Sequence, residues 1–221
     1  DLEIALDQQA TYDALEFYRS MLELCPPGAT GYSWGEMLTA FVSGATATGL
    51  YAGRVLANVA AQNPQIADSI TCALYPRMSR ELPAWTYNDF PCVCIPSAAS
   101  NKGEAKLFAA SLFDPAGYIP QLHAAPGHVL PVLESVAENP AYRDNEVIDR
   151  YPQEIDLMAS AAAQGYNLGF ETTAHQPNAK AGEIIASNAI AELVQRVVLN
   201  DANPQIAVGN TVTRLEEIMR S

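Results

Sequence analysis

The sequence predicts an α/β fold in which helices cover both faces of a small sheet. Apolar residues recur with the period of a helix through much of the chain. In the first half, three short runs at residues 45–51, 69–76 and 90–96 combine apolar and β-branched residues between Gly or Pro boundaries, which is typical of strands. Their alternation with helical segments favours α/β. A bundle made only of helices is the structural alternative, and it explains these runs poorly.

Two helices are expected before the first of these runs. The first has Thr11 as its N-cap and ends at the Pro-Pro-Gly sequence of residues 26–28. In the second, Ser33 can cap the start and Gly44 can end the helix. Its apolar stripe consists of Trp34, Met37, Leu38 and Phe41. We therefore expect Trp34 to lie in the core.

Further helices are expected along the rest of the chain. One covers residues 54–64 and another begins at Asn101, where Glu104 would complete a capping box. Loops should follow through residues 117–131. The last third should be helical over residues 152–165, in one long helix over 180–201, and after an Asn203 cap.

Charge and composition exclude several classes of protein. Twelve basic and twenty-five acidic residues give a net charge of −13, and no run of Lys or Arg exists, so nucleic acid is not an expected partner. No apolar run approaches the roughly 18 residues of a membrane-spanning helix. The chain begins at Asp1 without Met, so we expect either a removed leader or a piece of a longer protein.

The sequence lacks the common motifs of enzymes. A nucleophile elbow, a phosphate-binding loop and a dinucleotide fingerprint are all missing, and His123, His128 and His175 have no metal-binding spacing. The four cysteines, including Cys92 and Cys94, are expected to be buried structural thiols. We therefore expect no catalytic activity, no metal and no cofactor.

The order of several motifs carries a family resemblance. The segments "ALEFY", "YSWGEMLTAFVSGATATGLYAGR", "CIPSAASNKGEAKLFAASLF", "PGHVLPVLES" and "NPQIAVGNTVTRLEEI" follow one another over nearly the whole chain. In this order they resemble the extracellular solute-binding proteins of ABC importers, in particular the sugar-binding subgroup that includes maltose-binding protein. The resemblance implies a periplasmic-binding-protein-like fold of two lobes joined by a hinge.

The resemblance also implies that part of the protein is missing. Family members are much longer, and residue 1 corresponds to a point well inside them, so we expect this chain to be the C-terminal portion. Residues 1–83 and 134–221 would build the C-terminal lobe. Residues 84–133 would cross the hinge and belong to the N-terminal lobe, whose other parts have no counterpart here.

The resemblance places candidate ligand contacts at three positions. The strand after the second helix would deliver Tyr51, Gly53 and Arg54 to the cleft between the lobes. The hinge crossing would contribute Trp85, Tyr87, Asn88 and Asp89, and the long helix Ser187 and Asn188. An aromatic face suits a pyranose ring, and Arg54, where relatives can carry an aromatic residue, suits an anionic or strongly polar group.

The expected function is therefore solute binding for an ABC-type importer. The ligand would be a carbohydrate or a related polyol, delivered to membrane permease subunits. Localisation would be periplasmic or extracellular, with a lipid anchor on the full-length protein as an option. In the truncated chain, the apolar surface of residues 84–133 is expected to pair with another copy or to pack irregularly against the C-terminal lobe. A helical interaction or scaffold domain without a small-molecule ligand is the alternative, and a fold lacking strands at residues 69–74 and 90–95 would favour it.

Overall fold

The chain folds into two compact units, the first formed by both ends of the chain and the second by its middle. A computed structural model describes residues 4–77, 79–82, 86–87, 91–163, 165 and 178–221. The first unit spans residues 1–31 and 167–221, and the second spans residues 32–166. The lobe boundaries expected from the resemblance, near residues 83 and 133, lie inside the second unit.

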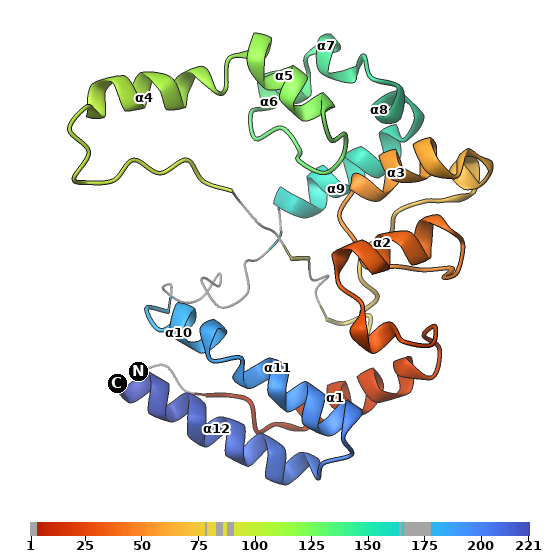
Figure 1. Ribbon diagram of the computed structural model, residues 1–221, viewed down its shortest axis with the longest axis vertical. Coiled ribbons are helices and arrows are strands. Elements are labelled where there is room, and N and C mark those ends of the chain that lie inside the picture. The colour runs from red at the N-terminus through yellow and green to blue at the C-terminus, as the bar shows by residue number, and fades with distance from the viewer. Residues whose placement is uncertain (1–3, 78, 83–85, 88–90, 164, 166–177) are drawn as a thin grey trace. The chain divides into compact units, whose positions relative to one another are not determined.

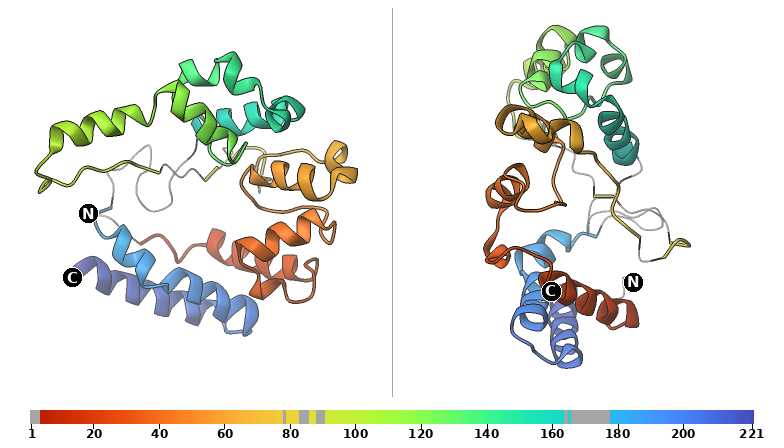
Figure 2. Two further views of the ribbon diagram at one scale, coloured as in Figure 1. Left: turned by 45° about the horizontal axis from the view of Figure 1, so that its top comes forward. Right: turned by 90° about the vertical axis from the view of Figure 1, so that its right-hand side faces the viewer.

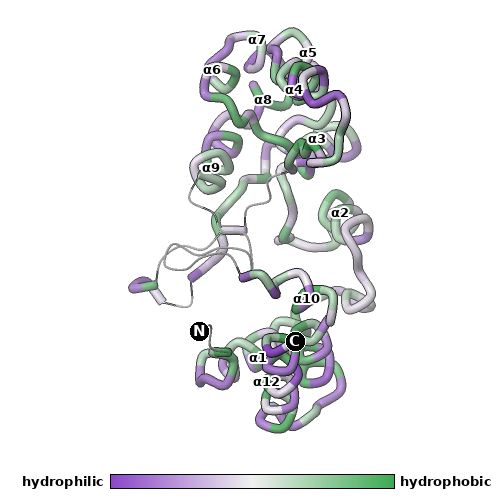
Figure 3. Tube along the Cα trace, turned by 90° about the vertical axis from the view of Figure 1, so that its left-hand side faces the viewer, coloured by the Kyte–Doolittle hydropathy of each residue, from purple (hydrophilic) through white to green (hydrophobic). Residues whose placement is uncertain are grey.

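Helices and helical turns are the only regular elements of the first unit in the described ranges. They are α1 (Gln9–Leu22), the 3₁₀ turn η1 (Ala29–Gly31), α10 (Ala181–Ala186), α11 (Ala189–Val194), the π-helical turn η3 (Gln195–Leu199) and α12 (Pro204–Arg220). Helices α11 and α12 lie side by side in both views of Figure 2, and α1 packs on η3. Along α1 and α12, hydrophobic and hydrophilic residues follow one another, as expected of amphipathic helices (Figure 3).

A small apolar core joins the two chain ends in this unit. Leu15 of α1 packs with residues of α11, η3 and α12, namely Leu193, Val197, Val198, Ala207 and Val208. Arg214 of α12 donates to the Glu192 carboxylate at 2.8 Å and to the Ser187 carbonyl at 2.5 Å. These bonds fix α12 against both helices of the segment that precedes it.

The second unit contains the remaining helices. They are α2 (Trp34–Val42), α3 (Arg54–Gln62), the 3₁₀ turn η2 (Pro64–Ser69), α4 (Lys102–Ser111), α5 (Pro115–His123), α6 (Glu134–Ala137), α7 (Pro140–Arg143), α8 (Glu146–Arg150) and α9 (Pro152–Ala163). Figure 1 shows α5 to α9 gathered with α3, while α4 extends away from them. Helix α4 buries none of its residues.

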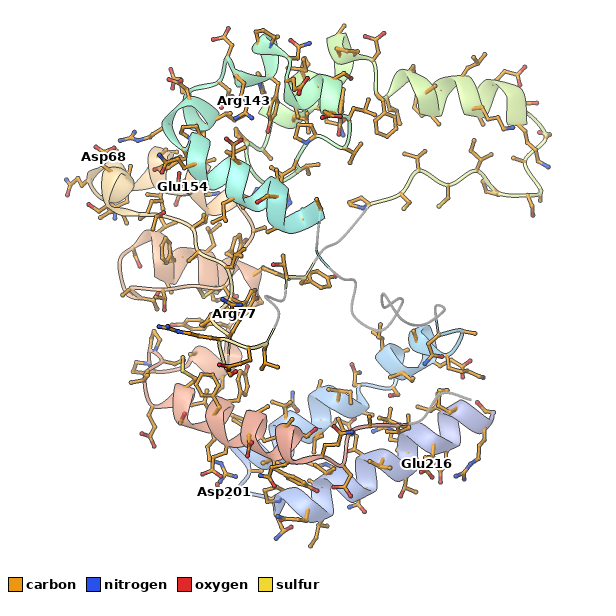
Figure 4. The ribbon with its side chains drawn as sticks, turned by 180° about the vertical axis from the view of Figure 1, so that it is seen from behind. Asp68, Arg77, Arg143, Glu154, Asp201 and Glu216 are labelled. Atoms are coloured by element: carbon orange, nitrogen blue, oxygen red, sulfur yellow. The ribbon has the colours of Figure 1, made fainter. Side chains whose placement is uncertain are left out.

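The core of this unit lies between α3, α5 and α9. Leu56, Leu122 and Ile155 are buried together with Tyr142 and Tyr151. The Tyr151 hydroxyl donates to the carbonyl of Ala67 at 2.8 Å, which ties α9 to η2 across 84 residues of sequence. Beside this bond, Asp68 lies on the surface (Figure 4). Its carboxylate pairs with Arg150 at 2.8 Å.

The predicted α/β fold is wrong. No strand or sheet occurs in the described part of the chain, so the expected periplasmic-binding-protein-like lobe, with its helix-covered sheet, is absent from it. The run at residues 69–76 begins in η2 and then places Ile70 and Cys72 against the helical core, while Thr71 donates to Glu154 at 2.8 Å. Two of its apolar side chains therefore pack on helices, Leu74 and Tyr75 stay exposed, and its backbone forms no ladder. In the run at 90–96, Pro91 and Pro96 lack the N–H that a ladder requires.

Three predicted helical boundaries are also wrong. Helix α1 begins at Gln9 after Gln8 as the N-cap, so Thr11, the predicted N-cap, lies inside the helix. The long helix expected over residues 180–201 is broken at Asn188, whose φ of 55° is left-handed. Ser187 causes part of the break, because its hydroxyl bonds both the Ile184 carbonyl and the Ala189 amide in competition with the helix. Residues 115–123, expected mostly as loop, form α5, because Asp114 caps Ala116 and Pro115 suits the first helical position.

Several helix ends are confirmed. Ser33 and Glu36 form a capping box at α2, and the resulting hydrogen bond from Ser33 lowers the pKa of the Glu36 carboxyl. Gly44 follows this helix with a φ of 77°. Asn203 caps α12 by accepting from Ile206 at 3.1 Å. At α4, however, Asn101 makes no side-chain cap bond, so the expected capping box is not formed.

Two buried tyrosines of the second unit predict opposite responses to removal of the hydroxyl. Tyr151→Phe leaves the carbonyl of the buried Ala67 unpaired, so we expect a loss of about 1–3 kcal/mol of unfolding free energy in urea titrations. The Tyr142 hydroxyl is buried without a partner in the described structure, and this burial raises its pKa. Tyr142→Phe should therefore be neutral or stabilising, and equal losses in both variants would contradict this assignment.

Candidate functional site

An exposed tryptophan supported by a second ring marks one surface of the second unit. Trp34, at the start of α2, meets Tyr51 edge to face, with ring centroids 5.3 Å apart and planes at 81°. Trp34 is 71% exposed, so the prediction that it lies in the core is wrong. It occupies the first turn of α2, whereas the buried Ala40 and Val42 lie at the other end of the helix. An exposed indole supported by a second ring offers a flat apolar face to a ligand.

Behind this pair, two glycines bring the start of α3 against the loop after α5. Gly53 is buried, and a Cβ on it would lie 2.1 Å from the Gly127 carbonyl oxygen and 2.7 Å from Cε of Met158. Gly127 has a φ of 74°, a conformation that side chains disfavour. Because Gly53 has no room for a Cβ and Gly127 has a backbone conformation that favours glycine, the two backbones touch and fix Arg54, the next residue, relative to the loop.

A hollow of about 320 Å³ lies where α2, α3 and this loop meet. Arg54, Asn58, Ala57 and Ala61 come from α3, Leu38 from α2, and Ala124, Ala125 and Pro126 from the loop. Its lining thus supplies one cation, one amide and a floor of small aliphatic groups. Trp34 lies one helical turn before the lining residue Leu38, so it shares a face of α2 with that residue, although neither Trp34 nor Tyr51 lines the hollow itself.

The structure brings together only part of the predicted ligand site. Arg54 lines the hollow and Tyr51 contacts Trp34, whereas Gly53 is buried behind them against Gly127. Tyr87 is half exposed, and Trp85, Asn88 and Asp89 lie outside the described residues. Ser187 and Asn188 belong to the first unit, at the break between α10 and α11, where the Ser187 hydroxyl serves as a helix cap.

Sequence reasoning missed Trp34 and every residue that lines the hollow except Arg54. The missed lining residues are Leu38, Ala57, Asn58, Ala61, Ala124, Ala125 and Pro126. The exposure of Trp34 could have been inferred from its position in the first turn of a capped helix. At a helix end, the apolar stripe can extend beyond the element that covers the rest of it. The pairing of small residues at Ala57 and Ala61, four apart on α3, marks a helix face that a neighbour or a ligand can approach closely.

A larger hollow of about 550 Å³ lies in the first unit, between α1 and the start of α12. Its lining includes the carboxylates Asp13 and Glu16, while Arg19 is bonded to the Val197 carbonyl at 2.6 Å. None of the predicted contact residues belongs to it. The cation in its lining is already engaged, so we regard the hollow beside Arg54 as the candidate site.

Other chemistry is sparse in the described ranges. They contain no group of three His, Cys, Asp or Glu residues placed to hold a metal ion, and no helix there has the length and apolar character to cross a membrane.

Three of the cysteines, Cys25, Cys92 and Cys94, are exposed, so the prediction of burial is wrong for them. Burial and the nearby Glu154 carboxylate raise the pKa of the Cys72 thiol, which favours its inert neutral form.

Comparison of this sequence with models of protein families finds no match. No curated protein matches it either. The candidate site is therefore argued from its residues alone.

The contact between Gly53 and Gly127 predicts a sharp dependence on side-chain size. Gly53→Ala forces a Cβ into the Gly127 backbone, so we expect a loss of about 1–3 kcal/mol in unfolding free energy. Gly103→Ala is the matched control, since a Cβ there meets open space on the exposed helix α4 and should stabilise by about 0.5–1 kcal/mol. Urea unfolding measures both, and a Gly53→Ala variant as stable as the parent would refute the contact.

Proposed function

We propose that this chain is a ligand-binding protein that serves as the substrate-binding component of an ABC-type importer. Its ligand is a carbohydrate or related polyol, which it delivers to membrane permease subunits in a periplasmic or extracellular setting. The single observation that carries the proposal is the exposed Trp34 ring, supported by Tyr51, on the helix face of α2 that also supplies Leu38 to the hollow at Arg54. The motif order from residue 14 to residue 218 supports the same interpretation.

The chemistry of the surface suits a sugar. Ring C–H groups of a pyranose form an apolar patch that packs on an aromatic face, here that of Trp34. Arg54 and Asn58 present planar groups whose N–H donors can bond hydroxyl or carboxyl oxygens. The lining contains no carboxylate, thiol or imidazole that could act as a general acid or base. The surface is therefore equipped to hold a ligand.

The fold adds no support to this proposal, since the expected sheet is absent from the described residues. The proposal rests on residue order and on the surface chemistry. In a two-lobed binding protein, closure is driven by contacts to both lobes that the open state lacks. A chain that provides one side of such a site should bind its ligand weakly.

Binding at this surface can be tested with an aromatic variant. We expect glucose or maltose to bind the chain with a dissociation constant of about 1 mM or weaker, and Trp34→Ala to abolish the binding, because the stacking face is lost. Saturation-transfer NMR measures such weak association directly. Tyr18→Ala, which removes an exposed ring from α1 in the other unit, is the control and should leave binding unchanged. Equal binding by the parent and Trp34→Ala would rule out this surface.

A helical interaction domain without a small-molecule ligand is the second candidate. The observation that favours it is the absence of strands at the described positions within residues 69–74 and 90–95. Helix α4 adds to it, since Leu107 and Phe108 are 73% and 64% exposed and the helix buries no residue. Exposed apolar surface of this kind marks an interaction face. Under this alternative a second copy of the chain covers α4.

Self-association through α4 is measurable by light scattering. The parent chain should form dimers or larger species whose proportion rises with concentration, because Leu107 and Phe108 leave water on contact. The double variant Leu107→Ser and Phe108→Ser should be monomeric. Leu24→Ser, at an equally exposed position in the first unit, should associate like the parent. A parent chain that stays monomeric at every concentration contradicts this function of α4.

A further inference from the structure

Arg54 is a cation without a partner among the described residues of an acidic protein. Of nine arginines, six form ion pairs with Asp or Glu in the described ranges, namely Arg19, Arg143, Arg150, Arg196, Arg214 and Arg220. Arg77 bonds the carbonyls of Arg80 and Leu82. The guanidinium of Arg54 has no ion pair or hydrogen bond with a described residue, although acidic residues outnumber basic ones by two to one in the chain. The hollow thus retains a cation that can pair with a ligand.

The neighbours of Arg54 leave its guanidinium available. Asn58 donates one amide hydrogen to the Arg54 backbone carbonyl at 2.9 Å and accepts from Gln62 at 2.8 Å. Its second amide hydrogen can therefore donate to a ligand. The other lining residues are aliphatic, so no carboxylate of the hollow competes for the guanidinium.

The size of the hollow sets a limit on the ligand. A volume of about 320 Å³ is at the lower end of the range of about 300–1,000 Å³ for small-molecule sites. One sugar ring suits this space, with its C–H face on Ala57, Ala61 and Leu38. A ligand seated there removes water from Arg54. A neutral sugar would then leave the guanidinium without an anionic partner, which is unfavourable.

We propose that the ligand of this hollow is a sugar acid, a carbohydrate ring that bears a carboxylate. The carboxylate accepts two hydrogen bonds from the planar guanidinium of Arg54, and the second Asn58 amide hydrogen bonds a ring hydroxyl. The aliphatic lining residues Leu38, Ala57 and Ala61 hold the apolar side of the sugar. This inference rests on the proposed function and narrows its ligand class.

The test compares three probes on the whole chain by NMR titration: glucuronate, glucose and acetate. The parent should bind glucuronate at least about tenfold more tightly than glucose or acetate, since a charge-assisted pair adds to ring contacts. Arg54→Gln should reduce the affinity for glucuronate to that for glucose. Arg80→Gln removes the same charge from an exposed arginine that has no ion pair with a described residue and lies outside the hollow, and it should retain the preference.

The titrations distinguish failure of the sugar-acid assignment from failure of the proposed function. Equal affinity of the parent for glucuronate and glucose would overturn the sugar-acid assignment and leave the proposed function standing. Acetate binding as tight as glucuronate binding would identify a small-anion site and would also overturn the assignment. If neither sugar binds, both the assignment and the proposed function fail. A preference for glucuronate that survives in Arg54→Gln would show that another group selects the carboxylate, which overturns the role of Arg54.

Discussion

The close approach of two backbones, Gly53 at the start of α3 and Gly127 in the loop after α5, is the constraint on which the candidate site depends. A Cβ on Gly53 would lie 2.1 Å from the Gly127 oxygen, so the contact exists only because both residues lack side chains. Tyr118 reinforces it, since its hydroxyl accepts from the Val132 amide at 3.2 Å and ties the loop to α5. Arg54 and Pro126 are the direct neighbours of these glycines, and the contact brings them to one hollow.

The parts of the fold that sequence reasoning predicted correctly are those decided by local chemistry. The cap at Ser33, the glycine stop at Gly44 and the Asn203 cap each involve residues within a few positions of one another. Their hydrogen bonds satisfy helix-end groups that have no other partner, so tertiary context does not override them. The same local logic predicted α3 between Arg54 and the proline at position 64.

The predictions that failed depended on partners distant in the sequence. A short apolar run becomes a strand only if another strand pairs with its backbone, and the run at residues 69–76 instead lays Ile70 and Cys72 on the helical core. Similarly, the apolar residues of 180–201 recur with helical spacing throughout, which predicted one long helix. The helix breaks at Asn188, next to the Ser187 carbonyl that accepts a hydrogen bond from Arg214 of α12. The apolar stripe of α2 predicted a buried Trp34, which is exposed. Hydrophobic periodicity shows which face of a helix is apolar, but it does not show how much of that face a neighbouring element covers.

The candidate site combines local sequence with long-range packing. Tyr51, Gly53 and Arg54 are close in sequence, and the family resemblance predicts all three as ligand contacts. Trp34, Asn58 and Pro126 join them only through packing. Burial of this arginine without a partner is costly, whereas leaving it exposed in an acidic chain keeps it attractive to anions. Arg54 supplies a positive charge next to the aliphatic lining of the hollow. A ligand that carries both a carboxylate and an apolar ring face therefore matches this site.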